Sequence, residues 1–235
     1  MERIQQFILP GVLVAVIAYL LGSISFSIIF TKVFDHKTDI RSMGSGNAGA
    51  TNVLRSVGKL PALFTTIFDF GKGAASVLIG QAVFRYFCGL YGAPGSLAHY
   101  GAYVAGFACI IGHIFPVYFG FRGGKGVLTC AAMMALIDWR VFLCCISVFI
   151  IVFLITKIVS LSSIIGSATY PLFTFLLSYF LDYKVGAISM AGVWVSTAAT
   201  FVIATVVIGK HHSNIRRILN GTEKKITDKS AKKKT

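Results

Sequence analysis

Apolar residues along this chain occur in long runs that are separated by short polar segments. Most of these runs approach the roughly 17 to 25 residues that an α-helix needs to cross a lipid bilayer. The pattern therefore predicts an all-α integral membrane protein. The runs cover residues 8–30, 74–88, 101–119, 141–156, 164–181 and 187–209.

Two further segments bear on the number of crossings. Residues 64–70 can extend the second run backward across Asp69 and Lys72. Residues 127–137 form a short apolar run, which as a helix reaches only about 16 Å of a hydrocarbon core near 30 Å. This short run therefore borrows length from its neighbours or does not cross.

The basic residues predict the orientation of the chain in the membrane. With the N-terminus outside, seven crossings, and outer turns at residues 138–140 and 181–184, all but four of the 22 Lys and Arg residues lie on the inner side. A single crossing over residues 127–156 would place the basic C-terminal tail outside. We therefore expect seven transmembrane helices, with five as the alternative. Both arrangements place the same loops on the cytoplasmic face: residues 31–59, 119–126, 157–163 and 210–235.

Composition agrees with a membrane protein and narrows its partners. Hydrophobic residues make up 56% of the 235 residues and charged residues 13%, which is outside the usual balance of a soluble domain. The formal net charge of +14 favours anionic lipid headgroups or small anions as partners. Nucleic acid is disfavoured because no basic soluble domain exists to hold it. The five cysteines lack metal-ligand spacing, so we expect no metal site.

The first cytoplasmic loop is dense in glycine, hydroxyl and amide groups. It reads "RSMGSGNAGATNVLRSVGK" over residues 41–59. Glycines allow backbone N–H groups to approach an anion, and the polar side chains can hydrogen-bond an oxygen-rich ligand. A surface turn is the alternative, but a turn between two membrane helices rarely needs this length. The candidate ligand-binding side chains are Ser45, Asn47, Thr51 and Asn52, with Arg41, Arg55 and Lys59 as flanking cations.

The second cytoplasmic loop reads "FGFRGGKG" over residues 119–126. Gly123, Gly124 and Gly126 around Lys125 can form an anion-binding nest, to which the next helix would add its dipole. The P-loop pattern is absent, because Gly126 follows Lys125 where Ser or Thr is required. The alternative is a tight connection whose cations contact lipid headgroups.

The third polar segment reads "GKHHSNIRRILNGTEKK" over residues 209–225. It predicts a short amphipathic interfacial helix that is capped by Ser213 or Asn214 and ended by Gly221. We expect residues 1–209 to form a transmembrane domain and residues 210–235 a cytoplasmic helix with a polybasic tail. Acid–base catalysis, phosphate binding and headgroup contact all remain open for His211 and His212.

The sequence shows no signature of a covalent acyl-enzyme. It contains no G-x-S-x-G elbow and no cysteine in an electropositive loop. Ser160, Ser162 and Ser163 begin a span, where helix capping is at least as good an explanation as ligand contact. A phosphate-ester transporter and a lipid-binding scaffold are the rival hypotheses. The transporter predicts internal repeats, of which we find none.

These segments together resemble the acyl-phosphate glycerol-3-phosphate acyltransferase family, the bacterial PlsY membrane enzymes. The resemblance runs nearly end to end, with one notable departure: Arg122 stands where lysine is common. The matching stretches are "GSISF" at 22–26, "DIRSMGSGNAGATNVLR" at 39–55, "DFGKG" at 69–73, "GHIFPVYFGFRGGKGV" at 112–127, "VSLSSI" at 159–164 and "HHSNIRRILNGTE" at 211–223.

The resemblance implies transfer of a fatty acyl group from acyl phosphate to the sn-1 hydroxyl of glycerol 3-phosphate. The products would be lysophosphatidic acid and inorganic phosphate, in the first acylation step of phospholipid biosynthesis. No cofactor is implied. We expect a monomer in the bacterial inner membrane, among anionic lipids, with its active site facing the cytoplasm.

The resemblance also implies residue roles. Ser45 and Arg55 would be catalytic residues of the first motif, with Asn47 and Thr51 beside them; Gly123, Gly124, Lys125 and Gly126 would bind phosphate; His211 and Asn214 would be catalytic; Ser163 would line the site; and Glu223 would be structural. Two hypotheses stand for the base. Either His211 takes the glycerol hydroxyl proton, or the phosphate of glycerol 3-phosphate takes it while His211 and Lys125 bind that phosphate; we favour the second.

Overall fold

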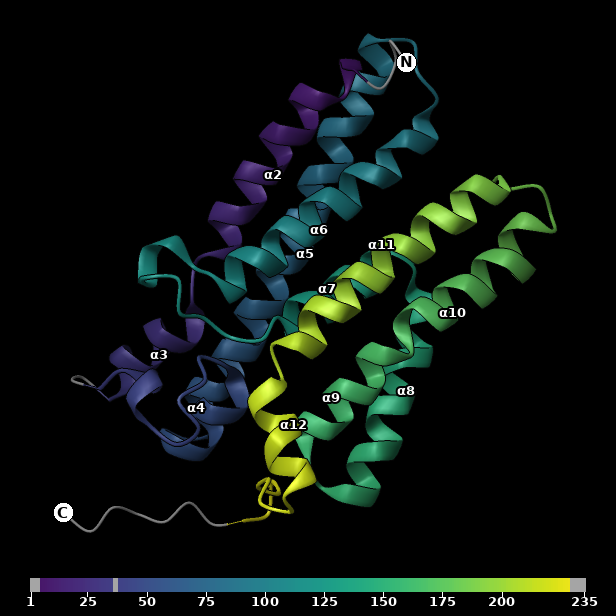
Figure 1. The fold of residues 1–235 in the computed structure, drawn as a ribbon. Helices are drawn as coiled ribbons and strands as arrows, with labels where there is room; N and C mark the ends of the chain where they lie inside the picture. The colour runs from purple at the N-terminus through teal and green to yellow at the C-terminus, as the bar shows by residue number, and fades with distance from the viewer. Residues whose placement is uncertain (1–4, 36–37, 229–235) are drawn as a thin grey trace. The chain divides into compact units, whose positions relative to one another are not determined.

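Helices account for all the regular secondary structure in the described part of the chain, residues 5–35 and 38–228 of a computed structural model (Figure 1). The predicted all-α architecture is therefore confirmed over these residues. His36, Lys37 and most of the predicted polybasic tail, residues 229–235, lie outside them. The helices group into two units, which divide between Ile137 and Asp138.

Within residues 5–35 and 38–137, the first unit contains six α-helices from α2 to α7 and three short 3₁₀ turns. Gly22 ends the first long helix, and the chain resumes a helix at Phe26 after Ser23 has turned its hydroxyl back to the Tyr19 carbonyl, at 2.8 Å. The α-helices are α2 (Ile8–Gly22), α3 (Phe26–Phe34), α4 (Ala50–Ser56), α5 (Lys59–Leu90), α6 (Ala98–Ile114) and α7 (Val127–Ile137).

Glycines allow the long helices of the first unit to approach closely. A Cβ at Gly22 on α2 would collide with the backbone of Cys109 on α6. A Cβ at Gly80 on α5 would likewise collide with the Gly101 carbonyl oxygen on α6. Helices in a bilayer gain little from burying apolar surface against one another, so close backbone packing of this kind contributes much of their association.

The second unit contains the remaining helices. Its first helix begins at Asp138, whose carboxylate accepts the Arg140 backbone N–H at 2.9 Å, and ends where Lys157 adopts a left-handed conformation with φ of 59°. The elements are α8 (Trp139–Thr156), α9 (Val159–Ala168), α10 (Tyr170–Leu177), a π-helix (Ser178–Tyr183), α11 (Met190–Gly209) and α12 (His212–Leu219).

Six helical segments among the described residues are long and apolar enough to cross a membrane. They are Ile8–Phe34, Lys59–Leu90, Gly95–Phe119, Trp139–Thr156, Val159–Tyr183 and Met190–Gly209. The short run predicted over residues 127–137 is the helix α7, with 11 residues. The second span begins at Lys59, well before the predicted residue 74, because the helix continues through Asp69 and Lys72.

Two local predictions were wrong. The outer turn predicted at residues 181–184 lies later, because the π-helix continues the span to Tyr183. The cap predicted for the last helix at Ser213 or Asn214 is also misplaced: α12 begins at His212 after His211, without a side-chain cap. Asn214 is buried instead, with a partner described below.

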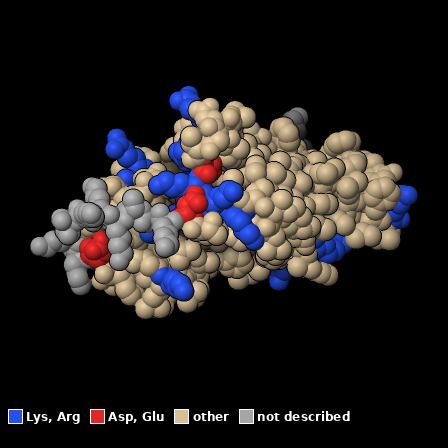
Figure 2. Space-filling view, turned by 90° about the horizontal axis from the view of Figure 1, so that it is seen from below, with Lys and Arg blue, Asp and Glu red and all other residues tan. Residues whose placement is uncertain are grey.

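Charged side chains are sparse on the surface. On the face shown in Figure 2 most of the surface carries neither charge, and basic side chains outnumber acidic ones. This agrees with the 22 Lys and Arg residues and 8 Asp and Glu residues of the sequence. Many large apolar side chains are exposed, as expected of helices that face lipid: Ile8, Leu9, Leu63, Ile155 and Phe201 are examples.

Candidate functional site

Asn52 organises the first loop, which we define as residues 39–49. Its side-chain nitrogen donates to the backbone carbonyls of Ile40, Met43 and Asn47 at 3.1, 2.9 and 3.1 Å. Its side-chain oxygen accepts the Ser45 backbone N–H at 3.0 Å. A single buried amide therefore satisfies backbone groups from both ends of the loop, and it holds Ser45 in place through its backbone.

The other predicted side chains of the first motif lie around this loop. Ser45 is exposed at its tip, and Asn47 is half-buried. Thr51 lies on the first turn of α4 and Arg55 on its last, and both are half-buried. The loop rests on an apolar cluster that is made of Ile28, Ile40, Ala48, Val53 and Ala62, with Phe119 and Met43 packed against it.

The second loop, residues 120–126, folds back onto the end of α6. The backbone N–H groups of Gly123 and Gly124 donate to the carbonyls of Ile114 and His113 at 3.2 and 3.1 Å. Gly126 has a φ of 79°, a left-handed conformation that glycine adopts without strain, and α7 begins at the next residue. Lys125 therefore lies beside the N-terminus of a helix, where backbone N–H groups favour an anion.

The two loops touch at Gly124. A Cβ at this position would collide with the Nε2 atom of His113 and would meet the carbonyl oxygen of Ala48 from the first loop. A Cβ at Gly123 would collide with the carbonyl oxygen of His113. A side chain larger than hydrogen therefore has no room at either position.

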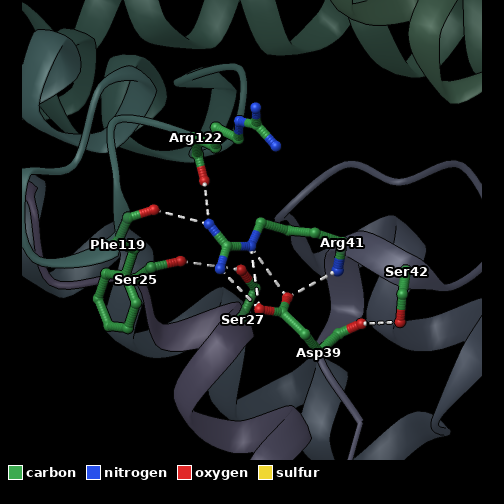
Figure 3. A network of polar contacts seen from close by, with 7 residues as sticks. All are labelled: Ser25, Ser27, Asp39, Arg41, Ser42, Phe119 and Arg122. Carbon is green, nitrogen blue, oxygen red and sulfur yellow. Dashed lines mark hydrogen bonds and ion pairs between the residues drawn. The ribbon is translucent and has the colours of Figure 1, made fainter.

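A guanidinium group joins the two loops more strongly (Figure 3). Arg41 donates from Nη2 to an Asp39 carboxylate oxygen at 2.7 Å and from Nε to both carboxylate oxygens at 3.0 Å. Its Nη1 donates to the carbonyl oxygens of Phe119 at 2.7 Å and Arg122 at 3.3 Å. Arg41 therefore connects the first loop to the backbone on both sides of Gly120.

Asp39 remains ionised to an unusually low pH in this arrangement. The side-chain hydrogen bond from Arg41 is the main cause that lowers the pKa of Asp39, against a smaller opposing effect of burial. The Asp39 carboxylate also accepts the Arg41 backbone N–H at 2.9 Å, and the Asp39 carbonyl accepts the Ser42 hydroxyl at 2.8 Å. The carboxylate thus caps the short 3₁₀ turn Ile40–Ser42 while it orients the guanidinium.

Glu223 is the centre of the polar cluster in the second unit. One carboxylate oxygen accepts from the Ser160 hydroxyl on α9 and from the Asn214 amide on α12, both at 2.6 Å. The other accepts from Arg217 Nε at 2.6 Å. Burial alone would raise the pKa of Glu223, but the hydrogen bonds from Ser160, Arg217 and Asn214 outweigh it and lower the pKa below 4.5.

His211 is 1% exposed and is oriented by the backbone. Its Nδ1 lies 2.7 Å from the Val207 carbonyl oxygen, one helical turn earlier on α11. Because a carbonyl only accepts, Nδ1 carries the proton, and in the neutral ring Nε2 keeps the lone pair. Ser163 is also buried, and its hydroxyl donates to the Val159 carbonyl of its own helix at 2.9 Å.

The structure thus brings the predicted residues together in two sets. In the first unit, Asn52 orders the first motif, which carries Ser45 and Arg55. Ala48 and Arg41 connect this motif to the loop that carries Lys125. In the second unit, Glu223 joins α9 to α12, beside the helix end that positions His211. No group of three or more potential metal ligands occurs within residues 5–35 and 38–228.

Sequence reasoning missed several contributors to these sets. Asn52 was expected to bind a ligand, but its amide satisfies backbone groups. Arg41 was expected only as a flanking cation and Asp39 had no predicted role, although their spacing is typical of a capped turn that ends in a salt bridge. His113 had no predicted role either, and nothing local in the sequence links it to Gly124.

Comparisons with known proteins agree along almost the whole chain. A family model described as glycerol-3-phosphate acyltransferase matches residues 12–221. A glycerol-3-phosphate acyltransferase of Clostridioides difficile is 42% identical over 93% of this chain and 96% of its own length. A relative of the same description from Cereibacter sphaeroides is 37% identical over 98% of this chain and 97% of its own.

Solved structures give the same result for the fold. A crystal structure of PlsY, an integral membrane glycerol 3-phosphate acyltransferase, in its glycerol 3-phosphate form has a TM-score of 0.74 and 32% sequence identity, and the match covers 92% of this chain and 94% of that one. The lysophosphatidic acid form matches with a TM-score of 0.72, at the same identity and coverage. The resemblance inferred from the sequence motifs is thereby confirmed.

Replacing Arg41 by Gln should loosen the second loop. The variant loses the ion pair with Asp39 and the contacts to the Phe119 and Arg122 carbonyls, so amide exchange in residues 120–126 should be about fivefold faster, on the order of 1 kcal/mol for a partly exposed group. Hydrogen–deuterium exchange mass spectrometry measures this. Arg122→Gln is the matched control, because this variant keeps the backbone carbonyl that accepts from Arg41. Equal exchange rates in the two variants would show that the Arg41 side chain does not hold the second loop.

Replacing Glu223 by Gln should destabilise the second unit by about 2 kcal/mol at pH 7, because three donors lose a charged acceptor. The folded pKa of Glu223 is depressed, so the stabilisation is present above the unfolded pKa and is lost as pH falls through the folded value. The deficit should therefore shrink at low pH. Thermal unfolding in detergent at pH 7 and pH 4 tests this, with exposed Asp228→Asn as control; a constant deficit would refute it.

Proposed function

Because the chain belongs to the glycerol-3-phosphate acyltransferase family, we propose that it transfers a fatty acyl group from acyl phosphate to the sn-1 hydroxyl of glycerol 3-phosphate. The products are lysophosphatidic acid and inorganic phosphate. The observation that carries this proposal is the contact between two glycine-containing loops at Gly124, immediately before the N-terminus of α7. The backbone N–H groups at the start of that helix, with Lys125 beside them, suit phosphate, which both substrates contain.

Acyl phosphate is the donor that the family resemblance implies, and its chemistry is consistent with this choice. An acyl phosphate is a mixed anhydride, already activated toward attack by an alcohol. The enzyme then needs to position two substrates and stabilise charge, and it needs no covalent intermediate. This agrees with a sequence that carries no nucleophile elbow. The long apolar helices provide a surface beside which the acyl chain can remain in lipid.

We assign phosphate binding to the second loop. Lys125 supplies a positive charge beside the N-terminus of α7. Gly123 and Gly124 hold the loop against the end of α6 through their N–H groups, and Gly126 provides the left-handed turn that leads into α7. The first loop supplies Ser45 and Arg55 as catalytic residues, with Asn47 and Thr51 as additional hydrogen-bonding groups. Ser45 suits this role because its hydroxyl is exposed while its backbone is fixed by Asn52.

We assign a binding role to His211, with the phosphate of glycerol 3-phosphate as the proton acceptor. The partner of His211 Nδ1 is the Val207 carbonyl. The carbonyl holds the ring with its proton on Nδ1, so Nε2 donates to the phosphate only in the protonated imidazole, and the negative charge of the bound phosphate favours that protonated form. Asn214 acts beside His211, Ser163 lines the site, and Glu223 holds Asn214 and the start of α9 in place.

The distribution of basic residues supports the proposed membrane topology. Seven crossings, with α7 as the short one, place the loops with Ser45, Lys125 and His211 on the cytoplasmic side of the bacterial inner membrane. There the soluble substrate and the anionic headgroups are both available. We propose that the enzyme acts as a monomer and without a cofactor.

The purified protein in detergent or lipid mesophase should release phosphate and form lysophosphatidic acid when it is given acyl phosphate and glycerol 3-phosphate. Phosphate release and product mass spectrometry measure the two products. Acyl-CoA offered in place of acyl phosphate should give no product. Failure to form either product from acyl phosphate would exclude the proposed reaction.

Replacing His211 by Gln should raise the Michaelis constant for glycerol 3-phosphate about tenfold and keep most of the turnover number. A loss of one charge-assisted hydrogen bond to phosphate has this magnitude. The adjacent, exposed His212→Gln should change neither constant by more than about twofold. A collapse of turnover with unchanged substrate binding would instead make His211 the base.

A further inference from the structure

Three titratable side chains are buried among the apolar helices of the first unit. Asp69 and Lys72 lie on α5 and are 1% and 4% exposed, and His113 lies near the end of α6 and is 7% exposed. Burying such groups is costly, and apolar residues of similar volume would often be at least as stable. Ionisable groups inside membrane helices therefore point to a functional requirement.

The three side chains form a connected chain of contacts. Lys72 Nζ lies 2.9 Å from an Asp69 carboxylate oxygen, and it donates to the Ile24 carbonyl at 2.6 Å, where α2 breaks before α3. The same Asp69 oxygen lies 3.7 Å from His113 Nδ1. At this separation the contact is electrostatic and not a hydrogen bond, and the carboxylate favours the ring orientation in which a protonated Nδ1 faces it.

The opposite side of the His113 ring faces the second loop. The Nε2 atom lies directly under Gly124, so a Cβ there would collide with it. The His113 carbonyl accepts the Gly124 backbone N–H at 3.1 Å, so backbone and side chain of one residue support the same glycine. The imidazole thus fills the space between the Asp69 carboxylate and the backbone that precedes Lys125.

We propose that Asp69, Lys72 and His113 are positioning residues that hold the Gly123–Gly126 backbone in its phosphate-binding conformation. This inference rests on the proposed function. Lys72 neutralises Asp69 and ties it to the α2–α3 break, Asp69 orients His113, and His113 supports Gly124. None of the three touches the substrate, so their effect on the reaction passes through the backbone of the loop.

Two variants of His113 separate the two sides of the ring. His113→Asn places its amide near the Nδ1 position, toward Asp69, and leaves the space under Gly124 empty. His113→Gln places its amide near the Nε2 position and retains support for Gly124. The Michaelis constant should rise about tenfold for His113→Asn and only about threefold for His113→Gln, with turnover within twofold in both.

Gly124→Ala identifies which substrate is affected. The substrate whose Michaelis constant rises in Gly124→Ala should be the one whose Michaelis constant rises in His113→Asn. Because both changes act on the same backbone, the double variant should be less impaired than the product of the single effects. Thr65→Val, at a buried polar position one helical turn before Asp69, is the control and should leave both constants unchanged.

A further variant covers the case in which a single substitution prevents folding. Asp69→Asn combined with Lys72→Met removes both charges, so no unpaired buried charge remains to unfold the protein. It should raise the same Michaelis constant about threefold to tenfold. Folded variants with wild-type Michaelis constants, or with lost turnover and unchanged binding, would overturn the positioning role. An inactive wild-type protein would instead refute the proposed function itself.

Discussion

Irregular backbone beside apolar helices must find its hydrogen-bond partners within the protein, and the site in the first unit depends on that constraint. The first loop has neither helix nor strand over much of its length, so side chains replace the missing secondary structure. The Asn52 amide serves carbonyls at both ends of the loop, and the Arg41 guanidinium serves carbonyls of the neighbouring loop. The side chains that hydrogen-bond the loop backbone also determine the conformation of the loops. The candidate site therefore forms when the loops become ordered.

This constraint suits the chemistry proposed for the protein. A reaction on an already activated acyl donor is accelerated mainly by fixed dipoles and charges around the reacting atoms. Such groups act best when they do not reorganise during the reaction. Ser45 fits this requirement, because its backbone is held while its hydroxyl is exposed. In the second unit, His211 and Asn214 are held in a similar way, by the Val207 carbonyl and the Glu223 carboxylate.

The sequence was sufficient to predict the all-α architecture and most of the spans, but it predicted few of the contacts between the candidate site residues. Long apolar runs mark the spans because a bilayer demands continuous hydrophobicity over a known length. The span ends were less accurate, since Asp69 and Lys72 interrupt the apolar pattern and are accommodated by their ion pair and by the bond from Lys72 to the Ile24 carbonyl. The cap of α12 was misplaced because Asn214, a good capping residue, is recruited by a glutamate nine positions later. Whether a polar side chain caps a helix or bonds a distant residue depends on which partners the fold brings near it. Local sequence propensity does not contain that information.

The enclosure of Gly124 also bears on how this protein can change over evolutionary time. Its two sides are closed by His113 from one helix and by Ala48 from the first loop, and each of these is fixed by a different group of neighbours. A larger residue at Gly124 would require room on both sides at once, and no single substitution supplies it. Gly124 should therefore be among the least variable positions in related sequences. Relatives that differ at His113 should also differ at residues that contact it.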